Sequence, residues 1–576
     1  MVVIGGAVAL TLGAAAAIVY ATQGGDGSRS PAPAAARPAS PGMAAVGVED
    51  VASAVGLSFR HGAFRFGVTD DPVAMMGGGL CWLDYDDDGW LDLFVVNSYD
   101  EREVARLRRE GGIPRTALFR NVRGRFVDVG AASGASIELR GNGCVAGDLD
   151  LDGHTDLYVT AVGTSALLWN NGDGTFSEGA EAAGVDASGW HTGAAVGDVD
   201  GDGRPDLFVA GYADLNAPLP DAAGGFPTTF AGVRDRLYLG SGQSRGRTAF
   251  REVGVVAGLE SSRFGYGLGA RFSDFDRDGD LDLYVANDLN PNRLYENVPW
   301  PGGPEADPAG LGFRFDERAA AAGVADPNAG MGVAAADWDG DGRSDLFVSN
   351  ARGQEHAVYR SRPLAADAPS FFDARDDVEP LAASERAFTG WGASLADIDL
   401  DTDLDLLLAN GAVPVRNLRA DAEGVQILEG RSADGLPGSF RDASRTVGLH
   451  QVRATVGRGL AAADYDNDGD MDAAIGSIGG PVVLLGTTTT AGNWLEVEVE
   501  GFHPGAEVTA VLRDGRELRR EVYAGGSYLS SDDPRCHFGL GGATSVRELV
   551  VRFPGGAEAR LADVAANQFV VVEAPG

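Results

Sequence analysis

The sequence predicts an all-β fold, a seven-bladed β-propeller with calcium-binding loops, followed by a small β-rich C-terminal domain. Three observations lead to this prediction. A nine-residue acidic motif recurs seven times at intervals of 50 to 76 residues, which is typical of a repeat architecture. Each copy lies between two short apolar runs that have the composition of strands. After residue 490 the motif stops, but strand-like alternation continues, as in NWLEVEVEG.

Residues 1–22 form an apolar run that has the length of a signal peptide or of an N-terminal membrane anchor. Residues 23–45 are rich in Pro, Ala and Gly, which predicts a flexible linker. We therefore expect an exported protein that is extracellular, periplasmic or membrane-anchored, with the propeller outside the cytoplasm. It would contact a membrane only through residues 1–22, if they are not cleaved.

The composition excludes some partners. The 576-residue chain has a formal net charge of −38, so it should repel nucleic acid and anionic lipid. Its three cysteines, Cys81, Cys144 and Cys536, are too few for a disulfide scaffold and do not have metal-ligand spacing. We expect stability to come from a hydrophobic core or from bound metal.

The motif reads D-x-D-x-D-G-x-x-D and supplies four carboxylates in each copy. Calcium prefers six to eight oxygen ligands, and carboxylates at positions 1, 3, 5 and 9 converge when the chain turns sharply between them. The predicted ligands are Asp84, Asp86, Asp88 and Asp92; Asp148, Asp150, Asp152 and Asp156; Asp198, Asp200, Asp202 and Asp206; Asp274, Asp276, Asp278 and Asp282; Asp337, Asp339, Asp341 and Asp345; Asp397, Asp399, Asp401 and Asp405; and Asp464, Asp466, Asp468 and Asp472. About six or seven calcium ions are expected.

The turn is predicted from glycine at position 6, because glycine tolerates positive φ. The sixth copy has Thr402 there, so we expect this loop to be the weakest site or to be rebuilt. Position 12 is apolar in every copy, as at Val95 and Ile475, whereas an EF-hand requires glutamate there. Each loop is therefore expected to lead into a strand. Solvated acidic turns are the alternative interpretation.

A pair of glycines precedes each loop, five and seven residues before its first aspartate, with His191 as the one exception. Glycine within a strand indicates close backbone approach, which an innermost strand near a propeller axis would need. The propeller is assigned to residues 46–490. The segment VEDVASAVGLSFRHG is expected to close the ring by pairing with the last blade.

These repeats resemble the FG-GAP/VCBS-repeat propellers of the integrin α-chain head. Residues 491–576 resemble the ASPIC/UnbV domain of the cartilage acidic protein family and its bacterial homologues. The residues that carry this second resemblance are Gly526-Ser527-Tyr528-Leu529-Ser530, Asp533-Pro534, His537-Phe538-Gly539-Leu540-Gly541 and Phe553-Pro554-Gly555-Gly556. The family usually has Trp-Pro-Ser-Gly at the last of these, and its Asn-Arg…Ile-Gly-Ala stretch is shortened here to FHPGAEVTA.

A ligand site is predicted where the glycine-flanked strands begin, at one mouth of the channel. Aromatic rings, two arginines and a histidine would meet there and suit an organic ligand with an anionic group. The candidate ligand-binding residues are Arg140, Asn142, Trp190, His191, Tyr266, Trp391 and Arg458. The alternative is that these side chains only fill the channel. Two long insertions, residues 98–115 and 212–237, are further candidates.

No catalytic motif is recognisable, so catalytic residues are unknown and enzyme activity is uncertain. His537 lies near Asp533, but packing explains it better than a role as a base. Calcium in such loops is expected to be structural. The predicted function is a binding or adhesion module for an unidentified protein, glycan or small-molecule ligand. The alternative is an enzyme that tailors secondary metabolites of the enediyne type at the channel mouth. A weaker third hypothesis is a membrane-tethered periplasmic assembly factor.

Overall fold

The structure is a computed structural model. It describes residues 42–575 apart from 221, 223, 245, 260–264, 304–305, 364–367, 376–386 and 433–434. The predicted N-terminal signal or anchor and nearly all of the linker lie outside the described residues. Residues 37–576 form one compact unit. In the described part of the chain, no helix is long and apolar enough to cross a membrane.

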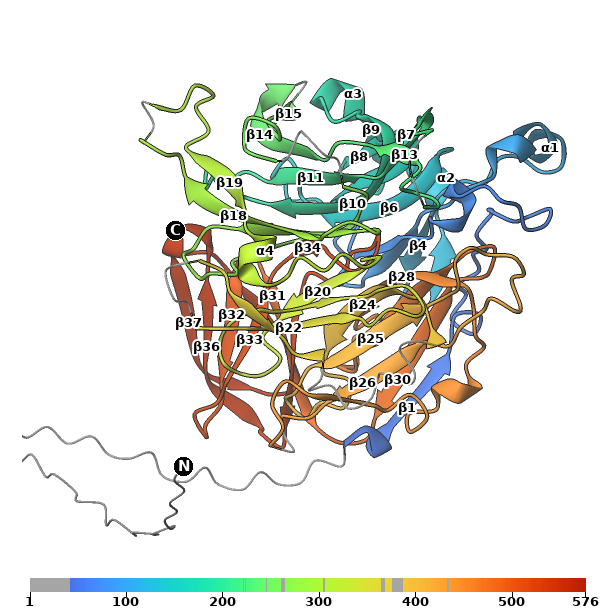
Figure 1. Cartoon of the computed structure of the whole chain (residues 1–576). Coiled ribbons are helices and arrows are strands. Elements are labelled where there is room, and N and C mark those ends of the chain that lie inside the picture. Colours follow the sequence, from blue (N-terminus) through green and yellow to red (C-terminus); the bar gives the residue numbers. More distant parts are fainter. Residues whose placement is uncertain are drawn as a thin grey trace, which may run out of the picture. The chain divides into compact units, whose positions relative to one another are not determined.

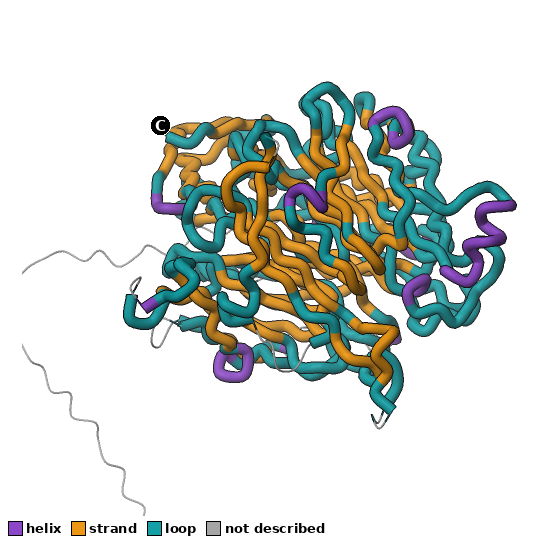
Figure 2. The backbone as a smooth tube through the Cα atoms, turned by 90° about the horizontal axis from the view of Figure 1, so that it is seen from above, coloured by secondary structure: helices purple, strands orange, loops and turns teal. Residues whose placement is uncertain are grey.

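Antiparallel strands in sets of four dominate residues 46–489 (Figures 1 and 2). Set 1 is β2 (Leu80–Leu83), β3 (Asp92–Val95), β4 (Ala117–Asn121) and β5 (Phe126–Asp128). Set 2 is β6 (Arg140–Gly147), β7 (Asp156–Thr164), β8 (Ala166–Asn170) and β9 (Phe176–Glu178). Set 3 is β10 (Ser188–Gly197), β11 (Asp206–Gly211), β14 (Arg236–Ser244) and β15 (Arg247–Glu252). Sets 2 and 3 are also joined, because β7 pairs with the first residues of β10.

The pattern continues along the chain. Set 4 is β16 (Gly267–Ser273), β17 (Asp282–Asn287), β18 (Arg293–Pro299) and β19 (Phe313–Glu317). Set 5 is β20 (Val333–Ala336), β21 (Asp345–Val348), β22 (Ala357–Ser361) and β23 (Phe371–Asp373). Set 6 is β24 (Gly390–Ala396), β25 (Asp405–Asn410), β26 (Gln426–Gly430) and β27 (Phe440–Asp442). Set 7 is β28 (Gly457–Ala463), β29 (Asp472–Ser477), β30 (Val483–Thr489) and, from the other end of the chain, β1 (Val46–Asp50). The all-β class and the propeller-like arrangement are confirmed.

The core lies between neighbouring sets. One hydrophobic cluster joins Leu80 and Trp82 of β2 to Ala461 of β28 and Leu484 of β30, and another joins Tyr284 of β17 to Val333 of β20. The first two strands of each set are almost entirely buried, which explains their continuous apolar sequences. Each set buries the apolar face of its neighbour. The apolar face of the first set is therefore buried only when the last set packs against it. This contact and the β1–β30 pairing, Val46 opposite Thr489, close the ring as expected.

The connections carry little helix. Among the residues that the structure describes, the α-helices are α1 (Val104–Arg109), α2 (Gly130–Ser133), α3 (Ala180–Ala183) and α4 (Ala319–Ala322). The two long insertions contain α1 and a hairpin, β12 (Ala213–Pro218) with β13 (Phe230–Gly232). In Figure 1, α1 lies at the edge of the molecule far from the C-terminal strands.

The C-terminal domain is β-rich, as predicted. One sheet has the order β33 (Glu517–Glu521), β32 (Glu507–Val511), β36 (Ser545–Arg552) and β37 (Glu558–Ala565). The other has the order β35 (Cys536–Gly541), β31 (Asn493–Val499) and β38 (Phe569–Val572). Side chains such as Leu495, Val508, Phe538 and Leu549 fill the space between them.

A segment of the C-terminal domain enters the centre of the ring. We call residues 524–531 the plug segment; it contains β34 (Ala524–Gly525), which pairs with β10. Ser527 exchanges backbone hydrogen bonds with Val333 of β20, and the carbonyl oxygen of Leu529 accepts one from Cys144 N of β6 at 3.2 Å. Ser531 bonds to β2. The first strands of several sets therefore surround residues that belong to the other domain.

Cys81 of β2 and Cys144 of β6 form a disulfide, with Cα atoms 6.2 Å apart, and Cys536 is a buried free thiol. The sequence analysis treated the cysteines as too few for a disulfide scaffold and missed this single covalent link. The two cysteines are 63 residues apart in sequence, but the bond between them joins the first strands of neighbouring sets. Only the closed packing of the two sets shows that these residues meet.

Candidate metal loops, channel interior and interdomain cavity

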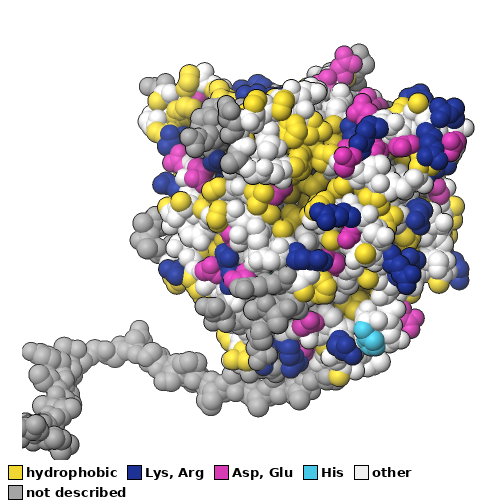
Figure 3. Space-filling view, turned by 45° about the vertical axis from the view of Figure 1, so that its right-hand side comes forward, with side chains coloured by type: hydrophobic (Ala, Val, Ile, Leu, Met, Phe, Trp, Pro, Cys, Tyr) yellow, Lys and Arg dark blue, Asp and Glu magenta, His cyan; other side chains and the backbone are white. Residues whose placement is uncertain are grey.

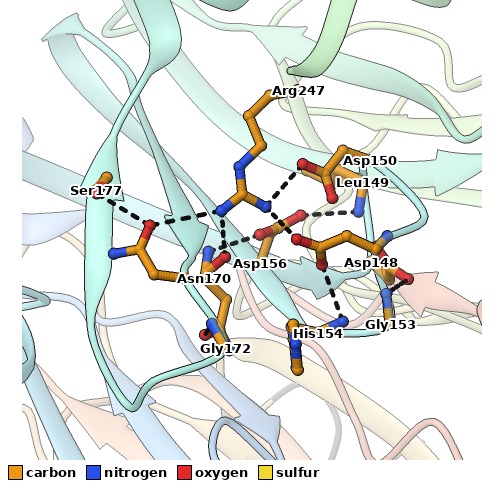
Figure 4. A network of polar contacts seen from close by, with 12 residues as sticks. Asp148, Leu149, Asp150, Gly153, His154, Asp156, Asn170, Gly172, Ser177 and Arg247 are labelled. Carbon is orange, nitrogen blue, oxygen red and sulfur yellow. Dashed lines mark hydrogen bonds and ion pairs between the residues drawn. The ribbon is translucent and has the colours of Figure 1, made fainter. Parts of the chain in front are cut away.

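Each acidic loop connects the first and second strands of a set, and its turn is fixed by backbone N–H groups (Figure 4). In the second loop, Asp148 accepts hydrogen bonds from Asp152 N at 3.1 Å and from Gly153 N at 2.8 Å. Asp156 accepts hydrogen bonds from Leu149 N at 3.0 Å and from Asn170 N at 2.7 Å. The carboxylates at positions 1 and 9 are therefore held in place by the fold.

Three of the four predicted ligands converge in each of five loops. Groups of at least three acidic side chains have oxygen atoms within 4.8 Å of one another, and two further groups accompany the five named here. The named groups are Asp84, Asp86 and Asp92; Asp148, Asp150 and Asp152; Asp198, Asp200 and Asp206; Asp274, Asp276 and Asp282; and Asp337, Asp339 and Asp345. Clustered carboxylates suit calcium, which takes oxygen ligands in flexible geometry.

Several of these oxygens are buried without a hydrogen-bond partner. They belong to the third position of a loop at Asp86, Asp150, Asp276 and Asp399, and to the ninth position at Asp345. At Asp399, which is 2% exposed, both carboxylate oxygens lack a partner. Buried polar atoms are nearly always paired, because desolvating them otherwise costs free energy. A cation ligated by these oxygens would remove that cost.

Burial makes ionisation of these carboxylates unfavourable when no cation is present. Desolvation, reinforced by neighbouring carboxylates, raises the pKa of Asp92 and that of Asp399 to about 8. The pKa of Asp464 rises to about 7, mainly through burial. A bound divalent cation has the opposite effect, since it favours the ionised form.

Arginines from outside the loops form ion pairs with carboxylates of the first, second and fifth loops. Arg120 lies 2.7 Å from Asp86 and 3.0 Å from Asp88. Arg247, from β15 in the next set, lies 2.8 Å from Asp150 and also contacts Asp152 (Figure 4). Arg360 contacts Asp339. The sequence analysis did not find these contacts, because the partners lie in different strands or different sets. Each guanidinium offsets part of the negative charge that a calcium ion would otherwise balance alone.

The sixth loop keeps the backbone conformation of the others despite Thr402. Thr402 has φ of 90° and donates its N–H to Asp397 at 2.8 Å, as the equivalent glycines do. Its hydroxyl accepts a hydrogen bond from Arg516 of the C-terminal domain at 2.7 Å. The loop is therefore not rebuilt. Thr402 adopts a φ that is unfavourable for a β-branched residue, and its side chain is hydrogen-bonded to the C-terminal domain. Whether this site is the weakest stays a prediction.

The seven candidate ligand-binding residues cluster only in part. Arg140 is engaged by Asp71 at 2.8 Å and Glu101 at 2.9 Å. The side chain of Asn142 donates to His191 O at 2.7 Å, and neither ring nitrogen of the buried His191 has a hydrogen-bond partner. Burial lowers the pKa of His191 to about 4. Trp190 and Tyr266 pack with Tyr212 in one aromatic cluster.

The plug segment fills the space between the remaining candidates. The ring of Tyr528 lies 4.7 Å from that of Trp391, and its hydroxyl donates to Met76 O at 2.6 Å. Arg458 is fully buried, lies over Trp391 and donates to Met75 O at 2.9 Å. Burial lowers its pKa to about 10. These side chains occupy the channel interior, and their role in ligand binding stays a prediction.

Partly buried hydrophobic residues lie against this interior. They include Leu215, Phe226 and Phe230 of the 212–237 insertion, together with Val68 and Leu418. Figure 3 turns toward the reader the side of the molecule that carries α1 in Figure 1, and yellow side chains gather there in a hollow. We call the surface formed by Leu215, Phe226, Phe230, Val68 and Leu418 the mouth face.

His537 is buried, and its Nε2 lies 3.0 Å from Gly469 O in the seventh loop. Burial lowers its pKa to about 4. This contact agrees with the packing role that the sequence analysis favoured.

A cavity of about 350 Å³ lies between the loop side of sets 4 to 6 and the C-terminal domain. Its lining includes β20 and the turn at residues 553–556. The sequence analysis missed it, because its walls come from two domains whose docking is not visible in either sequence pattern.

Family models match both parts of the chain. The model of the FG-GAP-like repeat matches residues 84–159, 148–209 and 274–348, and the model described as ASPIC and UnbV matches residues 500–576. The chain carries FG-GAP-like repeats followed by an ASPIC/UnbV domain. The FG-GAP-like matches contain five of the seven acidic loops, and the ASPIC/UnbV match contains the whole plug segment.

Relatives with similar sequence include cartilage acidic protein 1 of Mus musculus, 28% identical over 314 residues that make up 52% of this chain and 43% of the relative. The human protein of the same name is also 28% identical over 314 residues, 42% of its length. The chain thus spans less than half the length of these relatives.

Solved structures that resemble the chain include a complex of BBS1N with ARL6DN, with TM-score 0.38, 10% identity and coverage of 76% of this chain and 98% of that one. Another is an Agrocybe aegerita lectin, with TM-score 0.36, 14% identity and coverage of 70% and 87%.

Proposed function

We propose that the protein is an exported, calcium-binding β-propeller that acts as a binding or adhesion module for an extracellular partner: a protein, a glycan or a small molecule. The observation that carries the proposal is the repetition of buried carboxylate oxygens without donors in equivalent loops. Calcium would hold the loops together, and the partner would bind elsewhere.

Export is supported by the Cys81–Cys144 disulfide, because such bonds persist in oxidising compartments. It is also supported by the sequence of residues 1–22, which has the character of a signal peptide or anchor. The relatives named cartilage acidic protein carry a name that refers to an extracellular tissue.

The mouth face is the surface we propose for the partner. Partly buried hydrophobic residues of the 212–237 insertion lie there with Val68 and Leu418, and apolar surfaces often mark interaction sites. The opposite side of the propeller, which carries the acidic loops, is in contact with the ASPIC/UnbV domain. The mouth face is therefore the side of the propeller that we propose for the partner.

The calcium part is tested by counting bound metal and by thermal unfolding with calcium and then with excess chelator. We expect about six or seven ions per chain and a large fall in melting temperature on chelation. Little bound metal and an unchanged melting temperature would contradict the calcium assignment.

The binding part is tested by measuring retention of the purified protein on immobilised extracellular matrix. Leu215→Asp should reduce retention without lowering the melting temperature, because this side chain is only partly buried on the mouth face. The matched control is Leu561→Asp, at an exposed leucine of the C-terminal domain. Equal retention of both variants and the wild type would rule out the mouth face.

A further inference from the structure

One wall of the interdomain cavity, which we call its floor, is lined by buried polar side chains that have no part in the proposed function. Val333–Ala336 of β20 lie on its propeller side, and Glu521, Tyr523 and Asp532 lie on its C-terminal side. At about 350 Å³ it falls at the lower end of the range for small-molecule sites. The turn Phe553–Gly556, which carries part of the resemblance to the ASPIC/UnbV family, also lines it.

Arg271 of β16 is the central group of this floor. It is 3% exposed, its Nε donates to Phe272 O at 3.0 Å, and its guanidinium carbon lies 3.3 Å from the ring centroid of Tyr523. Its Nη2 forms an ion pair with Glu521 at 3.6 Å, which is too far for a hydrogen bond, and Nη2 has no hydrogen-bond partner. A buried donor of this kind is left with unused hydrogen-bonding capacity.

The acidic groups of the floor are already satisfied. Glu521 accepts a hydrogen bond from Ser273 Oγ at 2.7 Å. Asp532 accepts from Ser394 Oγ at 2.8 Å, from Tyr523 Oη at 2.7 Å and from Ala462 N at 2.7 Å. Arg520 also lines the cavity, and its Nη2, like that of Arg271, has no hydrogen-bond partner. The unmet capacity of the floor is therefore for donating hydrogen bonds.

The walls favour an apolar body on the ligand. Leu281, Leu395 and Leu404 line the propeller side, and Phe553 and Pro554 line the C-terminal side. A ligand that presents an anionic acceptor to Arg271 and an apolar group to these walls would match both parts of the cavity.

We propose that this cavity binds a small organic carboxylate, with its carboxylate group on Arg271 and its apolar part between the leucine and Phe553 walls. The proposal does not depend on the partner at the mouth face. The bound ligand as a whole would contact both domains, so its binding would stabilise the docking of one domain on the other.

The test is calorimetric titration of the full chain, in calcium-containing buffer, with acetate, benzoate, 3-phenylpropionate and succinate. Benzamide serves as the matched uncharged probe for benzoate. We expect at least one aryl carboxylate to bind at least tenfold more tightly than benzamide. If no member of the panel binds, or if benzamide binds as well as benzoate, the proposal is wrong.

Variants locate the site. Arg271→Gln should weaken carboxylate binding at least tenfold. Because this change also leaves Glu521 without its guanidinium neighbour and can unfold the protein, Ala336→Leu provides a second route: it keeps Arg271 and fills space at the half-buried lining residue Ala336. Arg445→Gln, at an exposed arginine of another part of the chain, is the matched control and should bind like the wild type. Undiminished binding by Ala336→Leu would place the carboxylate elsewhere and overturn the assignment.

Discussion

At the scale of single residues, Asp399 gives the strongest support for the proposed calcium sites. Its side chain is buried, neither oxygen has a hydrogen-bond partner, and burial together with its acidic neighbours raises its pKa to about 8. An isolated carboxylate in this position would be destabilising. The sixth loop was expected from its sequence to be the weakest site. Removal of a calcium ion from this loop should nevertheless lower the free energy of unfolding more than its removal from any other loop.

Asp399→Asn should have effects of opposite sign in the two metal states. With calcium, the substitution removes a ligand and should lower the free energy of unfolding by about 1–3 kcal/mol and the metal count by about one ion. With chelator, it removes a like charge from the cluster and should leave stability unchanged or increase it. Urea unfolding in both buffers measures this difference. Asp186→Asn, at an exposed aspartate, should change neither value. An equal loss in both buffers would mean that Asp399 has only a packing role.

His356 should make stability depend on pH. It is 1% exposed, its Nδ1 accepts a hydrogen bond from Asn350 N at 2.9 Å, and burial, with a smaller effect of Arg375, lowers its pKa from 6.5 to about 4. Between these values the unfolded chain binds a proton that the folded chain does not. The contribution of His356 to stability should therefore be constant above pH 6.5 and fall by up to about 3 kcal/mol as the pH is lowered toward 4.

The measurement is the free energy of unfolding in urea at several pH values, at constant free calcium. His356→Gln should reduce the slope below pH 6.5 by about one proton. His450→Gln, at an exposed histidine, is the control and should keep the wild-type slope. If His356→Gln also keeps that slope, the buried neutral imidazole is not its source.

At the scale of elements, the glycine pairs are explained by crowding along the axis. A Cβ at Gly79 would collide with Leu529 O of the plug segment and lie 2.7 Å from Gly143 Cα. A Cβ at Gly143 would lie 2.7 Å from Leu529 O. The neighbours are backbone atoms, which cannot rotate away. The second glycine of each pair thus allows the first strands to approach one another and the plug.

Gly79→Ala should destabilise the fold by about 1–3 kcal/mol or more, because the added methyl group meets backbone on two sides. Gly424→Ala is the matched control, since nothing lies within 4 Å of its added Cβ. Thermal and urea unfolding of both variants would measure the difference. Similar stability of the two variants would show that the plug does not pack against β2 in solution.

The Cys81–Cys144 disulfide is a covalent cross-link between β2 and β6, the first strands of neighbouring sets. Its removal in Cys81→Ala/Cys144→Ala should lower stability by about 2–5 kcal/mol. Alkylation of the denatured, unreduced wild type should modify only Cys536, and prior reduction should expose all three cysteines. Three modified cysteines without reductant would contradict the pairing.

Much of this architecture could be predicted from local patterns. The loops, the strands on either side of them and the closure by β1 follow from motifs that repeat within the chain. The plug segment and the arginines at the loops could not be predicted, because a residue such as Tyr528 or Arg247 meets its partners only after distant sets or domains pack together. The seven candidate ligand-binding residues were therefore recognised as neighbours only in part, and the contact of Tyr528 with Trp391 was not predicted.

At the scale of the whole molecule, the ASPIC/UnbV domain is held by the main chain of the acidic loops. Gly541 N donates to Leu400 O at 2.9 Å, and Arg535 donates to Asp464 O at 3.0 Å. Arg519 donates to Gly342 O at 3.3 Å. These contacts require each loop to keep its turn, so calcium in the loops would also support the docking of the second domain.

Chelation should therefore loosen the contact between the domains before the strands unfold. Hydrogen exchange should accelerate first in peptides covering residues 397–405, 464–472 and 535–541. Peptides from β36 and β37, which pack within the C-terminal domain, serve as the internal control and should change later. Uniform acceleration in all peptides would mean that calcium stabilises only the global fold.

The pairing of Val46 with Thr489 also constrains how the protein can be made. During synthesis β1 emerges early, but its partner strand β30 appears only when nearly the whole repeat region has left the ribosome. Until then β1 has no neighbour and set 7 is incomplete. A chain that crosses a membrane before folding would thus delay ring closure until its last repeat arrives on the far side, and any ribosomal stop before residue 483 would yield an open ring rather than a shorter closed one.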